Sequence, residues 1–335
     1  MIRTVIQGVG YYVPPRVVTN DELAKQMNTS DEWIVQRTGI KERRYIDDGV
    51  GASDLGLKAA EQALARAGLT AKDLDLILFS TLSPDVCFPG SACFLQAKLG
   101  CRQIAALDLR TQCTGFLYGL QTADAFIRTG TYKRVLLVGA EVHSTGLEFS
   151  DRGRDVTVLF GDGAGAVVLG PAEGDGTTAD RGVLFTKVCA DGTGAKELWC
   201  LAPTSARIPR LSHAMLDEGA QFPQMNGKLV FRWAVEKIPE IAMEALAATG
   251  YRIEDLDWFV PHQANLRINE MVAKRLGIPD EKCWNNIVRY GNTTAATIPI
   301  GLAELVEAGK AKPGDLMLFA GFGSGFTWGS AIVRL

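Results

Sequence analysis

The sequence predicts an α/β fold built from two related halves, and two features support this prediction. Helix-like and strand-like segments alternate along the 335 residues, with apolar, β-rich runs between amphipathic stretches. The sequence also repeats itself, because residues 63–80 resemble residues 245–262 at an offset of 182. Alternating elements are typical of sheets covered by helices, and the duplication predicts two copies packed about a pseudo-twofold axis.

The repeat is clearest where "ALARAGLTAKDLDLILFS" matches "ALAATGYRIEDLDWFVPH". In both copies a helix ends at a glycine, Gly68 or Gly250, and a buried strand follows the shared Asp-Leu-Asp. Two further pairs continue the repeat with small shifts in offset: 126–140 with 305–321, and 161–170 with 326–335. We therefore expect one half at residues 1–171 and the other at 172–335.

Composition places the chain among ordinary soluble globular proteins, with 47% hydrophobic residues, 22% charged residues and a net charge of −3. This balance lacks the basic excess typical of nucleic-acid binders. The start, "MIRTVIQGVGYYVPPR", has no signal-peptide pattern, and no apolar run approaches the roughly 18 residues of a spanning helix. We expect a cytoplasmic protein that binds neither nucleic acid nor membrane.

Seven irregularly spaced cysteines contain no Cys-x-x-Cys pair, which argues against a disulfide framework or a zinc ribbon. None of the three histidines lies in a close cluster of metal-ligand type, so we expect reduced thiols and no metal. Gly8 and Gly10 begin a weak dinucleotide-binding pattern, but Val13 replaces its third glycine and Pro14-Pro15 stands where a helix should begin. These glycines are expected to form a tight turn.

Cys113 lies at the junction of a predicted strand and a predicted helix within "LDLRTQCTGFLYGLQTADAFIRTG". A helix that begins near Thr114 would favour the thiolate through its partial positive charge, and the Cys113 N–H could help stabilise a tetrahedral oxyanion. On residue type alone, an inert core cysteine remains the alternative.

His262 follows the second strand of the repeat, and Asn292 precedes an alanine-rich helix. An offset near 179 aligns Asn292 with Cys113, so the pseudo-symmetry would bring all three residues to one central site. Gln263 and Asn265 supply neutral hydrogen-bonding neighbours, which favours a neutral imidazole that donates a hydrogen bond. A satisfied core histidine and a helix N-cap asparagine remain the alternatives.

Cys113 in "TQCTGF", His262 in "PHQANLR", Asn292 in "YGNTTAATIP" and the final "GFGSGFTWGSAIVRL" closely resemble the β-ketoacyl-acyl carrier protein synthase III family, the initiating condensing enzymes of type II fatty acid synthesis. The resemblance runs end to end, through "SDEWIVQRTGIKERR" and "DRGRDVTVLFGDGAGAVVLG". It implies a thiolase-like fold with two duplicated halves in five αβαβα layers, and a homodimer.

The resemblance also implies a decarboxylative condensation, an acyltransferase reaction. Cys113 would take an acyl group from acyl-CoA as a thioester and release CoA. His262 and Asn292 would then bind the thioester carbonyl of malonyl-acyl carrier protein and stabilise the enolate left as CO₂ departs. The carbanion would attack the acyl-cysteine to give a 3-oxoacyl-acyl carrier protein. No permanently bound cofactor is implied.

Further residues are assigned by the same resemblance. The N–H groups of Cys113 and Ser324 would form an oxyanion hole, with Ser324 in the middle of the family's Gly-Gly-Gly loop. Phe88 is a candidate for the primer pocket or the dimer interface. Residues expected to bind CoA and pantetheine are Trp33, Arg37, Arg152, Gly227, Phe231 and Asn265. Residues expected to dock the carrier protein are Arg232, Arg267, Lys274 and Arg275.

Residues 191–224 form a longer segment than compact family members have, and it falls where the cover of the substrate tunnel should lie. The length and branching of the primer are therefore not predicted. A specialised homologue that primes with longer or branched acyl-CoA, or condenses acyl chains in a secondary pathway, remains the main alternative. A papain-like hydrolase is disfavoured because its Cys-Gly-x-Cys-Trp setting is missing, and a non-catalytic subunit because Cys113 is present.

Overall fold

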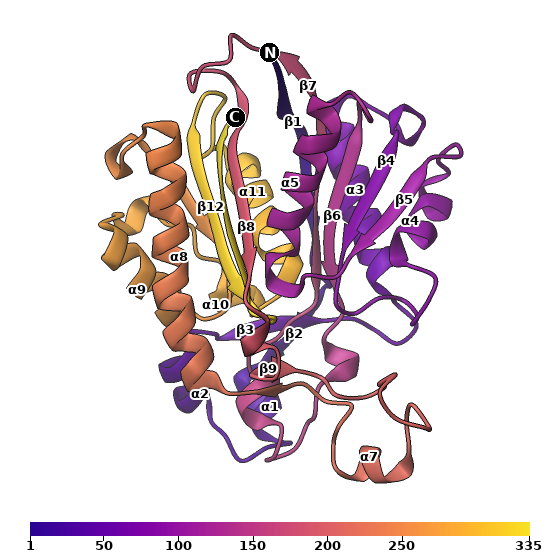
Figure 1. Ribbon diagram of the computed structural model, residues 1–335. Helices are drawn as coiled ribbons and strands as arrows, with labels where there is room; N and C mark the ends of the chain where they lie inside the picture. The colour runs from indigo at the N-terminus through magenta and orange to yellow at the C-terminus, as the bar shows by residue number, and fades with distance from the viewer.

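The first of two mixed β-sheets has five strands in the order β1-β7-β6-β4-β5, as seen in the computed structural model, which describes all 335 residues (Figure 1). Strand β4 pairs in parallel with β5 and β6, and β7 is antiparallel to both β6 and β1. These strands are β1 (Ile2–Tyr12), β4 (Leu76–Ser80), β5 (Ala105–Leu109), β6 (Val135–Glu141) and β7 (Gly163–Glu173).

The second sheet repeats this pattern with four strands in the order β11-β12-β13-β8. Strand β11 is parallel to β12, and β13 is antiparallel to both β12 and β8. The counterpart of β5 is reduced to one bridge between Phe259 and Cys283. The strands are β8 (Gly182–Ala190), β11 (Trp258–Pro261), β12 (Leu316–Gly323) and β13 (Thr327–Arg334).

Two inner helices, α5 (Gly115–Arg128) and α11 (Thr297–Glu307), lie between the sheets and begin 182 residues apart. Each is preceded by a three-residue helix, η2 (Gln112–Thr114) or η7 (Thr294–Ala296). The offset of 182 therefore continues through this region, and the alignment at 179 is wrong. Cys113 corresponds to Ala295, and Asn292 corresponds to Arg110, because the helix starts determine the register.

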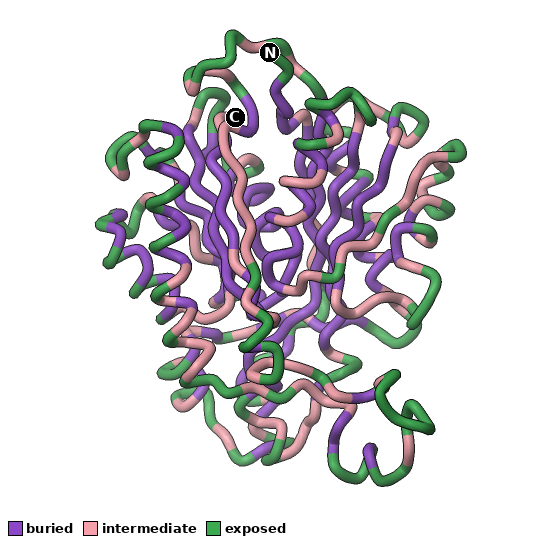
Figure 2. Tube along the Cα trace, in the orientation of Figure 1, coloured by how far each residue is buried: buried purple, intermediate pink, exposed green.

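Outer helices complete the five layers. Helices α3 (Ala52–Ala67) and α4 (Ser91–Leu99) cover the first sheet, and α8 (Gly227–Thr249) and α9 (Leu266–Leu276) cover the second (Figure 1). One large apolar cluster fills the space between the sheets around α5 and α11, and one lies under each outer layer. Figure 2 shows this buried interior along the strands and inner helices. The predicted αβαβα fold is confirmed.

Gly8 and Gly10 lie inside strand β1, so the predicted tight turn is wrong. A Cβ atom on Gly8 would lie 2.1 Å from the carbonyl oxygen of Ala63, and one on Gly10 would lie 2.2 Å from that of Ala59. These glycines allow α3 to pack closely on the strand.

The lower end of the sheets in Figure 1 is capped by shorter elements. The segment 191–224 lies there and contains little regular structure. None of the helices combines the length and apolar character of a membrane-spanning segment. Short elements of this end are β2 (Arg16–Thr19), α1 (Asn20–Ala24), α2 (Asp31–Thr38), β3 (Glu42–Tyr45), η3 (Ser144–Gly146), α6 (Arg154–Thr157), η4 (Gly192–Gly194), β9 (Leu198–Trp199), α7 (His213–Asp217), β10 (Gln224–Met225) and α10 (Ile287–Tyr290). Three more short helices are η1 (Ala71–Asp73), η5 (Ile253–Asp255) and η6 (Asp280–Lys282).

Candidate active site

Cys113 lies in the short helix η2, between the end of β5 and the start of α5. Its side chain is buried, and the preceding Gln112 has a φ of 44°, a left-handed conformation that few residues other than glycine adopt. The backbone therefore turns sharply at the nucleophile candidate. Helix α5 begins at Gly115, one residue after the predicted start.

Two backbone N–H groups interact with the sulfur of Cys113, its own and that of Ser324. The approach of this loop requires glycine at position 323, because a Cβ atom there would lie 2.5 Å from the Cβ of Cys113. In the loop Gly323-Ser324-Gly325, the positive φ of 138° falls on Gly325 and not on Ser324. A serine is therefore tolerated at the middle position, and its hydroxyl donates to the carbonyl of Leu198.

Burial raises the pKa of the Cys113 thiol to about 12, and the nearby Glu141 carboxyl acts in the same direction. The two N–H groups lower that pKa but do not outweigh burial. Burial of the sulfur therefore acts against the thiolate that the helix start is expected to favour.

His262 lies directly after β11, and its buried ring is neutral as expected, because burial lowers its pKa to about 3. Nδ1 lies 2.7 Å from the hydroxyl of Thr297, and Nε2 has no hydrogen-bond partner. A Cβ atom on Gly321 would lie 3.1 Å from the Cβ of His262 and 3.9 Å from the carbonyl oxygen of Cys113. His262 and Cys113 therefore approach the same glycine.

Asn292 is buried two residues before the start of η7, and its Oδ1 accepts a hydrogen bond of 2.8 Å from the N–H of Thr294. The N-cap of η7 is Thr293, so the helix N-cap interpretation of Asn292 is wrong, and its contact with Thr294 is an Asx turn. The amide NH₂ of Asn292 donates to no atom of the chain, so two donors remain for another molecule. Thr294 lies in the wall of the same cavity as Cys113, which brings Asn292 to the edge of the site.

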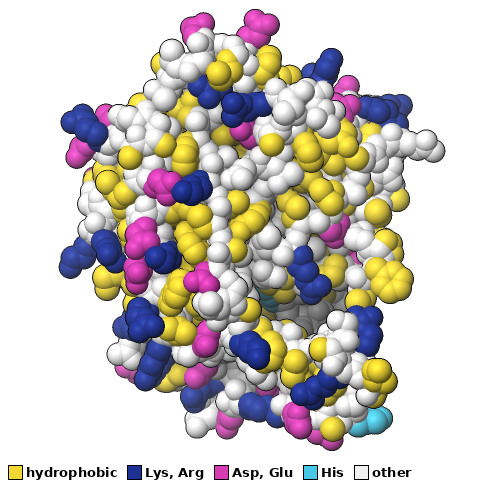
Figure 3. Space-filling model, viewed as in Figure 1, with side chains coloured by type: hydrophobic (Ala, Val, Ile, Leu, Met, Phe, Trp, Pro, Cys, Tyr) yellow, Lys and Arg dark blue, Asp and Glu magenta, His cyan; other side chains and the backbone are white.

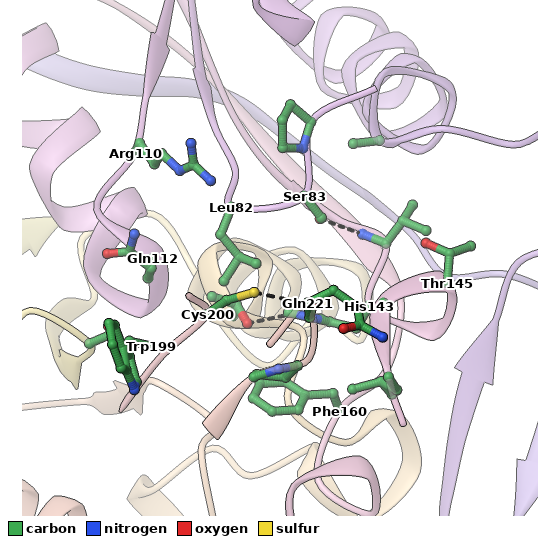
Figure 4. A pocket seen from close by; sticks show the side chains of 18 of the residues that line it. Leu82, Ser83, Arg110, Gln112, His143, Thr145, Phe160, Trp199, Cys200 and Gln221 are labelled. Atoms are coloured by element: carbon green, nitrogen blue, oxygen red, sulfur yellow. Dashed lines mark hydrogen bonds between the residues drawn. The ribbon is translucent and has the colours of Figure 1, made fainter. Parts of the chain in front are cut away.

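A cavity of about 670 Å³ opens at Cys113, within the size range of small-molecule sites (Figure 4). Trp199, Cys200 and Gln221 form part of its wall, so the segment 191–224 does cover this site. Figure 3 shows the molecular surface hollowed above that segment.

His143 is a wall residue that the sequence analysis missed. It lies just beyond β6 and is buried, its Nε2 is 2.7 Å from the hydroxyl of Thr294, and its ring packs 4.5 Å from the ring of Phe160. The sequence did contain a signal for His143. It follows an apolar strand of the first half, and His262 likewise follows an apolar strand of the second half.

The residues expected to bind CoA lie at the surface near α2. Trp33 is flanked by two guanidinium groups, those of Arg37 at 4.3 Å and Arg154 at 4.7 Å from the ring centre. Arg154 was not predicted, although "DRGRD" contains it. Arg152 instead contacts Glu148 at 2.7 Å and the carbonyl of Asp217.

Asn265, Gly227 and Phe231 begin the outer helices. Asn265 caps α9 and donates to the carbonyl of Arg37 at 3.0 Å, which joins α9 to α2. Gly227 and Phe231 lie in the first two turns of α8, next to the segment 191–224.

The basic residues expected to dock a carrier protein are exposed on α8 and α9. Arg267 and Lys274 form no ion pair, whereas Arg275 is held by the carbonyl of Val235. The side chain of Met271 is 47% exposed and shares the helical face of Arg267 and Lys274. This face combines free positive charge with an apolar centre.

Phe88 is 81% exposed, and it lies near a second exposed apolar residue, Val86. Strand β5 is an edge strand, and its Leu107 is also exposed. Exposed apolar groups beside an unpaired edge are typical of a surface that another chain covers.

Comparison with known proteins identifies two matching family models. Residues 107–192 match the model of 3-oxoacyl-[acyl-carrier-protein] synthase III, and residues 246–335 match that of its C-terminal part. The β-ketoacyl-[acyl-carrier-protein] synthase III of Geobacillus kaustophilus is 47% identical over 98% of both chains. That of Sinorhizobium medicae is 46% identical over the whole of both chains.

Solved structures agree with these matches. The 3-oxoacyl-[acyl-carrier-protein] synthase III of Aquifex aeolicus superimposes with a TM-score of 0.89 at 40% identity, over 99% of this chain and 100% of that one. The priming β-ketosynthase of the R1128 polyketide biosynthetic pathway has a TM-score of 0.88 at 32% identity, over 99% and 96%.

Proposed function

The chain belongs to the β-ketoacyl-[acyl-carrier-protein] synthase III family, and from this we propose that it joins an acyl-CoA primer to malonyl-acyl carrier protein with loss of CO₂. It is a condensing enzyme of the acyltransferase class, and the product is a 3-oxoacyl-acyl carrier protein that initiates fatty acid synthesis. The observation that carries the proposal is 47% identity to a curated synthase III over 98% of both chains, together with Cys113 at the cavity.

In the first half-reaction, the sulfur of Cys113 attacks the thioester carbonyl of the primer. The C–S bond to CoA breaks, and the thiol proton of Cys113 ends on the CoA sulfur. The N–H groups of Cys113 and Ser324 are directed at the sulfur, so they are suited to stabilise the oxyanion formed there. Because the free thiol has a pKa of about 12, binding of the substrate has to promote loss of its proton.

In the second half-reaction, His262 and Asn292 bind the thioester carbonyl of the malonyl group. The bond between the α-carbon and the carboxylate breaks, CO₂ leaves, and the electron pair forms an enolate. The enolate carbon attacks the acyl-cysteine, and Cys113 leaves as the thiolate, which takes a proton from water. Neutral donors suit this step, and the supporting observations are the unbonded Nε2 of His262 and the free NH₂ of Asn292.

Substrate contacts follow the same assignment. The CoA nucleotide would bind at Trp33 with Arg37, Arg152 and Arg154, and the pantetheine arm would pass Gly227, Phe231 and Asn265. The acidic carrier protein would dock on Arg232, Arg267, Lys274 and Arg275 around the exposed Met271. The protein would act in the cytoplasm as a homodimer joined along β5 and Phe88, without a permanently bound cofactor or metal.

The identity of the primer separates the two candidate functions. The cavity of about 670 Å³ beside Cys113 has to admit the pantetheine arm as well as the acyl group, so its volume alone does not select acetyl over a longer or branched acyl group. Arg110, Gln112 and His143 add polar groups to its wall. The first candidate function, the general initiating enzyme, would use acetyl-CoA as its primer.

The test is the mass of the intact protein after exposure to acetyl-, butyryl- and octanoyl-CoA separately. We expect one acyl adduct, lost in Cys113→Ala and retained in Cys200→Ala, a matched change at a second cysteine of the cavity. The chain length that forms the adduct most rapidly identifies the primer class. An adduct that persists in Cys113→Ala would refute the assigned nucleophile, and absence of any adduct in the unmodified enzyme would refute the acyl-transfer proposal.

A further inference from the structure

The hydroxyl of Thr297 lies between two groups of the active site. Its Oγ1 is 2.7 Å from Nδ1 of His262 and 3.0 Å from the carbonyl oxygen of Thr294. That carbonyl already accepts the backbone N–H of Thr297, so it is not left unpaired if the hydroxyl turns away. All three residues are buried, which protects these contacts from competition by bulk water.

A hydroxyl has one proton, so it supports two arrangements of the neutral imidazole. If it donates to the Thr294 carbonyl, it accepts Nδ1–H of His262, and Nε2 presents a lone pair. If it donates to Nδ1, the ring proton lies on Nε2, which then becomes a donor. The first arrangement contains two hydrogen bonds within the chain and the second contains one, so the first is favoured until an acceptor reaches Nε2.

The other half of the molecule shows that the fold does not require this hydroxyl. At the offset of 182, His262 corresponds to Ser80 and Thr297 corresponds to Gly115. A Cβ atom on Gly115 would lie 1.8 Å from Oγ of Ser80, so the first half excludes any side chain at this helix start. The hydroxyl is therefore present only in the half that contains His262.

We propose that Thr297 is a positioning residue that lets His262 exchange its ring proton between Nδ1 and Nε2. In the free enzyme Nδ1 is protonated. When a thioester carbonyl arrives, the buried contact opens transiently, Nδ1 loses a proton to water, Nε2 gains one from water, and the hydroxyl turns to donate to Nδ1. The ring stays neutral and gains the donor that decarboxylation requires. This inference rests on the proposed function of His262.

The tautomer is measured directly by ¹⁵N NMR of protein labelled at histidine. The chain has only three histidines, of which His213 is exposed and His143 is identified by the His143→Gln variant. The probe is an amide analogue of malonyl-pantetheine, whose carbonyl accepts a hydrogen bond but which resists decarboxylation. We expect the protonated nitrogen of His262 to change from Nδ1 to Nε2 when the analogue binds. An unchanged tautomer would overturn the proposal.

Two substitutions at one position test the hydroxyl itself. Thr297→Val should lose the Nδ1-protonated form of the free enzyme, because Nδ1–H then has no acceptor. It should also slow CO₂ release from malonyl-acyl carrier protein about tenfold, because the ring loses the hydrogen bond to Nδ1 that orients it while Nε2 donates. Acylation of Cys113 should stay within about twofold, since it does not use this donor. Thr297→Ser keeps the hydroxyl and should restore both the tautomer and the rate.

Thr249→Val is the matched control, because the Thr249 hydroxyl is buried and bonds only to the helix carbonyls of Ala245 and Leu246. It should alter neither readout. Wild-type rates of CO₂ release in Thr297→Val, or an equal loss in Thr297→Ser, would overturn the proposal. If the wild-type protein takes up no acyl group and releases no CO₂, the proposed function fails instead, and the spectrum of the free protein still tests the Thr297 contact.

Discussion

Gln112 and Thr294 are the two residues other than glycine with a positive φ, 44° and 49°, and they stand 182 residues apart. Each is the first residue of a three-residue helix that leads into an inner helix. The same left-handed turn therefore recurs in both halves, but it positions different residues in each. In the first half it presents Cys113, and in the second half it contacts Asn292 and His143.

The turn at Gln112 predicts a dependence of stability on residue shape. Gln112→Gly should leave the free energy of unfolding within about 0.5 kcal/mol of wild type, because relief of strain offsets the added freedom of the unfolded chain. Gln112→Val should lower it by about 2 kcal/mol, because a β-branched residue tolerates a positive φ poorly. Urea unfolding measures both. A valine variant as stable as the glycine variant would contradict this account.

The raised pKa of Cys113 predicts a particular pH profile for alkylation. Because the thiolate is the reactive form, the rate with iodoacetamide should rise about tenfold per pH unit between pH 7 and 9 without a plateau. Peptide mass spectrometry separates Cys113 from the exposed Cys87, Cys93 and Cys200. A plateau near neutral pH would show that the helix start and the two N–H groups outweigh burial.

Two buried neutral histidines predict instability in acid. His143 and His262 have a pKa of about 3 in the folded protein against an ordinary value of 6.5. Between these values the unfolded chain binds protons that the native protein does not, so stability should rise with pH up to about 6.5. The change is about 1.4 kcal/mol per pH unit for each histidine.

Urea unfolding at several values between pH 4.5 and 7.5 measures this slope. His143→Gln should reduce it by about one proton equivalent. His213→Gln removes an exposed histidine and should leave the slope unchanged. Equal slopes in His143→Gln and wild type would argue against a neutral buried His143.

The sequence was sufficient for two packed α/β halves because the duplication can be read from glycines and Asp-Leu-Asp segments at the same elements in both halves, and the five layers followed from the family resemblance. It was also sufficient to select Cys113, His262 and Asn292 as candidates. The register near Cys113 was wrong because the helix starts, which fix the offset, have unlike residues, Gly115 and Thr297.

Other features depend on three-dimensional burial. The raised pKa of Cys113 follows from burial of its sulfur among residues distant in sequence, which local sequence does not encode. His143 joins the site through a hydrogen bond to Thr294, a residue 151 positions away. Gly8 and Gly10 were read as a turn because their real cause, the close approach of α3, involves residues about 50 positions later.

The free basic face of α9 predicts a docking effect. Arg267→Glu should raise the KM for malonyl-acyl carrier protein and leave acylation by acyl-CoA unchanged, because exposed charge pairs act mainly on association. The effect should weaken as salt rises. Lys312→Glu, a matched reversal at an exposed lysine without an ion pair, should change neither parameter. An unaltered KM in Arg267→Glu would count against docking on this face.

The assignment of His262 and Asn292 to the second half-reaction predicts that the two steps can be separated. Asn292→Asp retains an oxygen that can accept the Thr294 N–H but removes the NH₂ donors, and His262→Ala removes Nε2. Each variant should lose about 10²–10³ in the rate of CO₂ release from malonyl-acyl carrier protein, the usual effect of losing one oxyanion donor.

The rate of Cys113 acylation in these variants tests whether His262 also acts in the first half-reaction. The thiol of Cys113 has to lose its proton during attack, and the two backbone N–H groups at the sulfur are the groups assigned to stabilise the charge that develops. On that assignment, both variants should still acquire the acyl mass in a single turnover at near wild-type rates. If Asn292→Asp is acylated normally but His262→Ala is not, then Nε2 of His262 takes the thiol proton from Cys113. The first half-reaction would then depend on His262 as its base, and the separation of roles argued here would be refuted.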